Sequence, residues 1–204
     1  MLRRWRLRLP LSPLQARLAE RLRSAPAAPT ESADAAPRAA VAVVVSPDPD
    51  SVLLIRRAER EDDPWSGHMG LPGGRADPED PDLVATAMRE TVEEVGFALR
   101  PDELLGVLED VWPRSPLPRR IVVRPFVFAI SERLPVTLSG EVQEAFWIPV
   151  QELLKPEVYR DTVIRLSGEN RVFPAYHLDP GVVWGLTERI LTPLLSLIAD
   201  RPGA

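Results

Sequence analysis

The sequence predicts an α+β domain, and three observations support this fold class. Runs rich in β-branched and aliphatic residues recur between turn signals, as in residues 39–45 and 52–58, and such runs are typical of strands. A segment that begins near Asp80 carries apolar side chains at helical spacing. A final apolar segment near the end of the chain has the same character. A chain of 204 residues can bury one substantial core, so we expect one domain plus an arm.

Composition excludes several classes of protein. The net charge of −5 argues against general nucleic-acid binding, which requires a basic surface. The absence of cysteine excludes disulfides, thiolate metal sites and cysteine nucleophiles. No apolar run is long enough to span a bilayer. We therefore expect a cytoplasmic protein with no membrane or nucleic-acid partner.

The first 38 residues predict a helix and a linker. Residues 12–15 have the spacing of a capping box, with proline at the first helical position. An apolar stripe follows, formed by Leu14, Leu18 and Leu22. We expect this helix to dock on the domain, whereas a membrane-surface or dimer-contact helix is the alternative. Residues 24–38 are rich in Ala, Pro and Ser and predict a linker. The predicted division is an arm, 1–38, and a domain, 39–204.

The two runs at 39–45 and 52–58 flank the turn sequence SPDPDS and predict a hairpin in a central sheet. Arg57, at the end of the second run, is a candidate substrate contact. An irregular loop rich in glycine then leads to Gly73 and Gly74. His68, in this loop, is expected to be a hydrogen-bonded structural residue.

A helix is predicted after this loop, with Asp80 as its N-cap, Pro81 at its first position and Gly96 as its left-handed stop. One narrow arc of this helix should face a core, and it contains Val84, Met88, Thr91 and Val95. A different arc contains Glu90, Glu93 and Glu94. These carboxylates are either a solvated acidic face or a site for a hard cation such as Mg²⁺, which prefers oxygen ligands.

The second half of the chain predicts further strands and a last helix. Residues 104–110 and 121–130 are predicted strands, and Pro125 suggests a bulge or a sheet edge. A strand around Phe146 is followed by a helix that begins near Val150, and a hairpin turns at residues 167–170. The C-terminal helix is expected to bury an apolar face formed by Trp184, Ile190, Leu191, Leu194 and Leu195, and to kink or restart at Pro193.

Four arginines lie near or within the second of these strands and could contact a phosphorylated substrate: Arg114, Arg119, Arg120 and Arg124. Guanidinium groups match phosphate oxygens in bidentate fashion. The alternative is a solvated surface loop.

The acidic helix resembles the Nudix box. Arg89, Glu90, Glu93, Glu94, Gly96 and Phe97 match its second half, with Thr91 in an apolar position. The first half departs, because Gly74 lies one residue too far upstream and Pro81 falls where the box has glutamate. A one-residue insertion explains both departures, and Asp80 or Asp82 could replace that glutamate. The resemblance implies a Nudix-type α/β/α sandwich, with a mixed β-sheet between helices and an N-terminal helical arm.

The resemblance also implies a Mg²⁺- or Mn²⁺-dependent diphosphatase. We assign Glu90 and Glu94 as metal ligands, with Glu93 and the carbonyl of Gly74 as further candidates. The general base is Glu93 or Glu141, since members of this family often place another carboxylate in a loop after the box. Arg89 would orient the carboxylates through charge-assisted hydrogen bonds. The metal assignment requires no shift of pKa, since all these acids are expected to be ionised at neutral pH.

The layout resembles the coenzyme A pyrophosphatase branch in particular. Three features support this resemblance: residues 38–41, the Asp77-Pro78-x-Asp80 sequence, and Tyr176 with residues 183–187. That branch usually has Leu-Arg-x-His-x-Gly-Gln where residues 62–68 differ here. Coenzyme A or its esters are the expected substrate. ADP-ribose, dinucleotides or nucleotide sugars are alternatives, and a non-catalytic nucleotide sensor is a second alternative. The oligomeric state is open, although an exposed Leu14 and Leu18 stripe would fit a homodimer.

Overall fold

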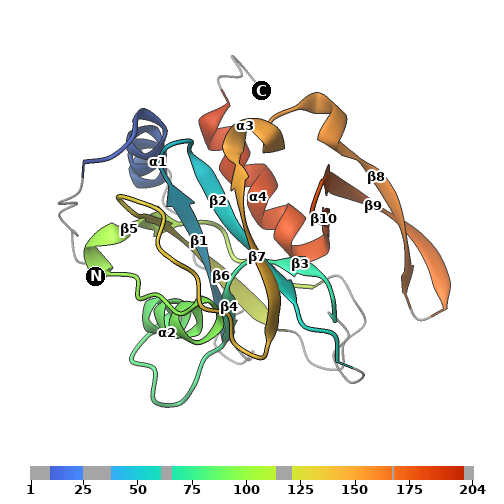
Figure 1. Cartoon of the computed structure of the whole chain (residues 1–204), viewed down its shortest axis with the longest axis horizontal. Coiled ribbons are helices and arrows are strands. Elements are labelled where there is room, and N and C mark those ends of the chain that lie inside the picture. The colour runs from blue at the N-terminus through green and yellow to red at the C-terminus, as the bar shows by residue number, and fades with distance from the viewer. Residues whose placement is uncertain (1–9, 25–37, 61–65, 114–120, 167, 200–204) are drawn as a thin grey trace.

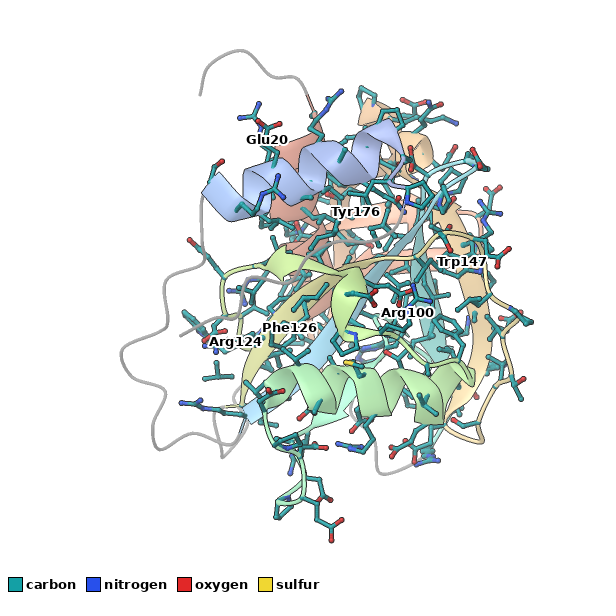
Figure 2. The ribbon with its side chains drawn as sticks, turned by 90° about the vertical axis from the view of Figure 1, so that its left-hand side faces the viewer. Glu20, Arg100, Arg124, Phe126, Trp147 and Tyr176 are labelled. Carbon is teal, nitrogen blue, oxygen red and sulfur yellow. The ribbon has the colours of Figure 1, made fainter. Side chains whose placement is uncertain are left out.

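The computed structural model describes residues 10–24, 38–60, 66–113, 121–166 and 168–199. It is a sandwich in which a β-sheet lies between helices, as the sequence resemblance implies (Figures 1 and 2). The helices are α1 (Pro13–Ser24), α2 (Leu83–Val95), α3 (Val150–Leu153) and α4 (Gly185–Ile198), with 3-10 turns η2 (Pro101–Glu103) and η3 (Pro156–Val158). The strands are β1 (Arg38–Ser46), β2 (Ser51–Arg57), β3 (Met69–Gly70), β4 (Gly73–Arg75), β5 (Leu104–Val107), β6 (Val122–Ala129), β7 (Val142–Pro149), β8 (Tyr159–Leu166), β9 (Glu169–Leu178) and β10 (Gly181–Trp184).

Strand β1 lies at the centre of the main sheet, whose order is β3-β2-β1-β6-β5. It runs parallel to β6 and antiparallel to β2 and β4, and β7 pairs with β2, so the expected mixed sheet is confirmed. Alternate side chains of β1 reach opposite cores because a strand has a period of two residues. Ala40, Ala42 and Val44 pack on the α2 side. Val41, Val43 and Val45 pack in the core shared with α1 and α4.

Helix α1 docks on the domain, as expected. The predicted capping box is present, because the Ser12 amide donates to Oε1 of Gln15 and the Gln15 amide donates to Oγ of Ser12. Leu18 and Leu22 are buried in the core. Leu18 is buried and Leu14 is partly buried against the same core, so this stripe is not exposed as the suggested dimer contact would require. The possible homodimer itself stays a prediction. The division of the chain at residues 38 and 39 stays a prediction.

Four expectations about the second half need correction. Strand β5 ends at Val107, three residues earlier than predicted. Pro125 is not at an edge, because β6 lies between β1 and β5, and the irregular register falls on the β5 side between Leu104 and Gly106. Helix α4 continues through Pro193, so it does not restart there, whereas the alternative of a kink stays a prediction. It begins after Trp184, which ends β10 and therefore does not belong to the helical face.

A separate three-stranded sheet has the order β10-β9-β8. Its hairpin β8–β9 turns at the predicted position and projects from the rest of the chain (Figure 1). Within the described residues, no helix combines the length and the apolar character needed to cross a membrane.

Candidate active site

Helix α2 begins two residues later than the predicted N-cap implies. Its N-cap is Asp82, whose side chain accepts a hydrogen bond of 2.9 Å from the Ala85 amide. Pro81 therefore precedes the helix. Its predicted stop is confirmed, since Gly96 has a φ of 80° and its N–H donates to the Val92 carbonyl. The apolar arc faces the sheet as expected, with Thr91 and Val95 buried.

The three box glutamates differ in their surroundings. Glu93 is exposed, Glu90 is half-buried, and Glu94 is only 3% exposed. A solvated acidic face therefore describes Glu93 alone. Glu94 turns toward the glycine pair, where its Oε2 accepts a hydrogen bond of 2.8 Å from the Gly73 amide. This contact joins α2 to β4, which is held to β1 through the pair of Gly73 and Val41.

The second glycine makes room for another carboxylate. A Cβ added to Gly74 would lie 2.4 Å from Oε1 of Glu90. The Glu90 carboxylate therefore packs directly on the backbone of β4 at Gly74. Glycine is required here by the close approach of the carboxylate, since Gly74 has no positive φ.

Arg89 links the loop before α2 to two glutamates of the helix. Its Nε and Nη2 donate to the two carboxylate oxygens of Asp80 at 3.0 and 2.9 Å. Its Nη1 donates to Glu90 at 2.9 Å and to Glu93 at 3.0 Å, and its Nη2 also reaches the Arg75 carbonyl. This answers a question that the sequence leaves open: Asp80 is the acid beside Arg89, and Asp82 caps the helix. Spacing was the available signal, because Asp80 follows Gly74 by the interval that the box has between its glycine and its glutamate.

Burial changes the ionisation of the site. It raises the pKa of Glu94 to about 7, and the nearby charge of Glu90 adds to this rise while the Gly73 amide opposes it. Burial also raises the pKa of Glu90, against the opposing effect of Arg89. The hydrogen bond from Arg89 is the main cause that lowers the pKa of Asp80. The expectation that all these acids are ionised at neutral pH is therefore wrong for Glu94, because this side chain is removed from solvent.

Glu141, the residue directly before β7, is a further carboxylate near this cluster. Its charge contributes to the raised pKa of both Glu90 and Glu94. The Glu141 carbonyl accepts a hydrogen bond of 2.8 Å from the Ala58 amide, at the end of β2. Its side chain is 55% exposed and lies 3.1 Å from Nη1 of Arg60. Sequence patterns gave no signal for Arg60, since its role depends on the pairing of distant segments.

The arginines that the sequence suggests as substrate contacts lie in different surroundings. Nη1 of Arg57 lies 3.9 Å from Oε1 of Glu94, so this arginine belongs to the site. Arg124 forms a bidentate pair with the buried Asp110, at 2.7 and 2.8 Å. Arg124 belongs to β6, which lies between β1 and β5, and Figure 2 shows it toward one end of α2. Arg114, Arg119 and Arg120 lie outside the described residues, so their predicted contacts stay predictions.

His68 is placed by its ring and its backbone. Its ring packs edge-on against Trp184 at 5.0 Å, and its carbonyl accepts from the Arg57 amide. This placement agrees with the structural role expected for it.

The carboxylates can hold a divalent cation, although they do not form a finished cage. Among the described residues, no three acidic or imidazole side chains converge closely enough to do so. Glu90, Glu94 and the Gly74 carbonyl nevertheless supply oxygen donors against one short stretch of backbone, and hard cations prefer this donor set. Burial and, to a smaller extent, the charge of Glu90 raise the pKa of Glu94, and a bound cation would favour its ionised form.

The sequence and the fold of this chain are similar to those of known proteins. Residues 36–165 match the model of the NUDIX domain. The chain is 33% identical over 153 residues to the human mitochondrial coenzyme A diphosphatase NUDT8, a match that covers 73% of this chain and 63% of that protein. It is 31% identical over 164 residues to an uncharacterised Nudix hydrolase, NudL of Yersinia pestis, covering 79% of this chain and 80% of the relative. A MutT/nudix family structure from Enterococcus faecalis superposes with a TM-score of 0.57 at 16% identity, covering 94% of this chain and 76% of that one.

Proposed function

The chain belongs to the Nudix family, and on this premise we propose that it hydrolyses a pyrophosphate bond in a nucleoside diphosphate linked to another group. The observation that carries the proposal is the meeting of Glu90 and Glu94 at the Gly73–Gly74 backbone, with Glu141 near both. Coenzyme A or one of its esters is the proposed substrate. Two observations support it, namely the coenzyme A diphosphatase activity for which the human relative is named and the resemblance of the chain to that branch.

Glu90 and Glu94 would bind Mg²⁺ or Mn²⁺, with the Gly74 carbonyl and Glu93 as additional donors. The cation would neutralise charge on the diphosphate and make a nearby water more acidic. Arg89 keeps Glu90 and Glu93 in position, and Asp80 keeps Arg89 in position. Arg57 adds positive charge beside Glu94, where a diphosphate oxygen would lie. Arg124 stays a candidate for the same role, although Asp110 holds its guanidinium.

Glu141 is the proposed general base, and Glu93 is the alternative. Both side chains are 55% exposed and each is paired with an arginine, Glu141 with Arg60 and Glu93 with Arg89. Glu141 is preferred because its charge acts on both Glu90 and Glu94. A carboxylate accepts a proton readily from a water that a cation has made more acidic, so the base needs little tuning of its pKa.

A second substrate class is supported by the sequence between residues 62 and 68. The basic residues that the coenzyme A branch carries there are missing from this chain. If those residues contact coenzyme A in that branch, this chain would prefer ADP-ribose, a dinucleotide or a nucleotide sugar.

The experiment is a substrate panel. The protein is incubated with Mg²⁺ or Mn²⁺ and coenzyme A, acyl-coenzyme A, ADP-ribose, NADH, diadenosine polyphosphates and nucleotide sugars, and products are identified by mass. Release of 3′,5′-ADP and 4′-phosphopantetheine supports the leading proposal. Turnover of another compound alone supports the second class. Tight binding of one compound with no turnover of any would favour a sensor and contradict the enzyme proposal.

Two glutamine variants and a control test the site itself. Glu90→Gln and Glu94→Gln should each lower turnover by about 100-fold or more, because each removes one charged oxygen donor. Glu132→Gln is the matched control, since Glu132 is exposed on the loop after β6. Turnover at the wild-type level in Glu94→Gln would contradict the assignment of the metal site.

A further inference from the structure

The β8–β9 hairpin extends beyond the strand that supports it. Strand β10 pairs only with residues 175–178 of β9. The remaining residues of β9 pair with residues 161–166 of β8 in a two-stranded ribbon, which projects from the body (Figure 1). Two-stranded hairpins are marginally stable in water, and a third strand or a packed face usually stabilises them.

The outer edge of this ribbon is open in the part of the chain that the structure describes. Strand β8 is the terminal strand of the order β10-β9-β8. An edge strand presents a row of backbone N–H and C=O groups that can pair with another strand. The hairpin therefore offers a template for one more antiparallel strand.

One face of the ribbon has an exposed apolar centre between opposite charges. Val163 lies directly opposite Val172, and these side chains are 62% and 64% exposed. Asp161 and Arg165 precede and follow Val163 by two residues, so all three side chains of β8 share one face. Both charged side chains are exposed.

We propose that β8 pairs antiparallel with β8 of a second copy of this chain, about a two-fold axis at Val163. Asp161 of each copy then lies opposite Arg165 of the other, which forms two cross-strand charge pairs. The valines form a continuous row across four strands, since each Val163 lies between its own Val172 and the other Val163. The interface is isologous, as a closed two-fold dimer requires.

The charge pattern selects this register among those that a two-fold axis allows. A two-fold axis at Asp161 would place two carboxylates opposite each other. A two-fold axis at Arg165 would place two guanidinium groups opposite each other. A centre at Thr162 or Ile164 places a charged side chain opposite Val163. Only the centre at Val163 pairs opposite charges and joins the two apolar pairs. This surface is distinct from α1, whose leucines are used within one copy.

The test is the oligomeric state of the full chain, measured by sedimentation velocity from about 1 to 100 μM. We expect a dimer that dissociates on dilution. Asp161→Arg and Arg165→Asp should each raise its dissociation constant by about tenfold or more, because each places like charges opposite one another twice. The double exchange, Asp161→Arg with Arg165→Asp, restores both pairs and should recover the wild-type constant to within about threefold.

Two further measurements separate this interface from any other. Val163→Lys should yield a monomer, whereas Leu138→Lys, at an exposed leucine on another loop, should dimerise like the wild type. Amide hydrogen exchange in β8 should slow as the protein concentration rises. A chain that stays monomeric throughout the range overturns the proposal. The proposal is also overturned if the single charge reversals leave the dissociation constant of the dimer unchanged, or if hydrogen exchange of the β8 amides does not slow in the dimer.

Discussion

The Glu90 carboxylate lies against the Cα of Gly74, where an added Cβ would come within 2.4 Å of Oε1 of Glu90. The backbone of Gly74 does not need positive φ, so the glycine is required by its neighbour and not by its own conformation. At this contact between α2 and β4, the observed position of the Glu90 side chain leaves room for only a hydrogen atom on the Cα of Gly74.

Gly74→Ala should therefore displace the Glu90 side chain and weaken metal binding by about 10- to 100-fold. The free energy of unfolding should change by less than about 1 kcal/mol, because the displaced group is the end of a flexible side chain. Titration with Mn²⁺ by calorimetry, with urea unfolding beside it, measures both effects. Gly70→Ala is the matched control, since an added Cβ there meets no atom within 4 Å. Equal metal affinity in the two variants would contradict the role of this contact.

The two aspartates before α2 should respond differently to substitution. Asp80→Asn removes the charge that holds Arg89, so turnover should fall by about 10- to 100-fold. Asp82→Ala removes the helix cap, which should cost about 1 kcal/mol of stability and leave the turnover of the folded protein unchanged. Steady-state kinetics and thermal unfolding of both variants measure this difference. The reverse pattern would show that Asp82 is the acid that supports Arg89.

The stability of the metal-free protein should depend on pH through Glu94. Its pKa in the folded protein is about 7, above its ordinary value of 4.5, so the folded protein binds more protons between these pH values. The stability conferred by protonated Glu94 is complete below pH 4.5 and is lost as the pH rises through about 7.

Glu94→Gln removes this dependence. It should be more stable than the wild type by about 3 kcal/mol at high pH and nearly equal to it at low pH. Urea unfolding with a chelator at pH 5 and pH 9 gives the comparison, with Glu132→Gln as a control for an exposed glutamate. A stability difference that is the same at both pH values would contradict the raised pKa.

Arg124→Ala separates a structural role from the substrate contact predicted for this residue. Removal of the guanidinium leaves the buried Asp110 without this partner, which should lower the free energy of unfolding by about 2 kcal/mol. We expect KM to stay within about threefold, because Asp110 holds the guanidinium through two of its nitrogens.

Arg171→Ala is the control for this variant, since its pair with Glu169 is exposed and should contribute little. A large rise in KM with unchanged stability would favour the substrate contact instead.

Local sequence decides which glutamates share a helix and where that helix ends. Helical periodicity relates residues three and four positions apart, so the buried arc of α2 and its stop at Gly96 are readable without any tertiary information. The choice between Asp80 and Asp82 is different. Both are plausible caps within one turn, and only the position of the Arg89 side chain distinguishes them.

The sequence by itself determined the family resemblance, the mixed sheet that this resemblance implies and the acidic helix. The tertiary structure decided how the acids behave: Glu94 is buried against Gly73, Glu90 packs on Gly74, and Glu141 approaches from a loop more than forty residues away. Burial and long-range proximity depend on how β1, β4 and α2 pack together, and no local pattern encodes them. These two quantities set the pKa of Glu94, so the chemistry of the site follows from the fold rather than from the box alone.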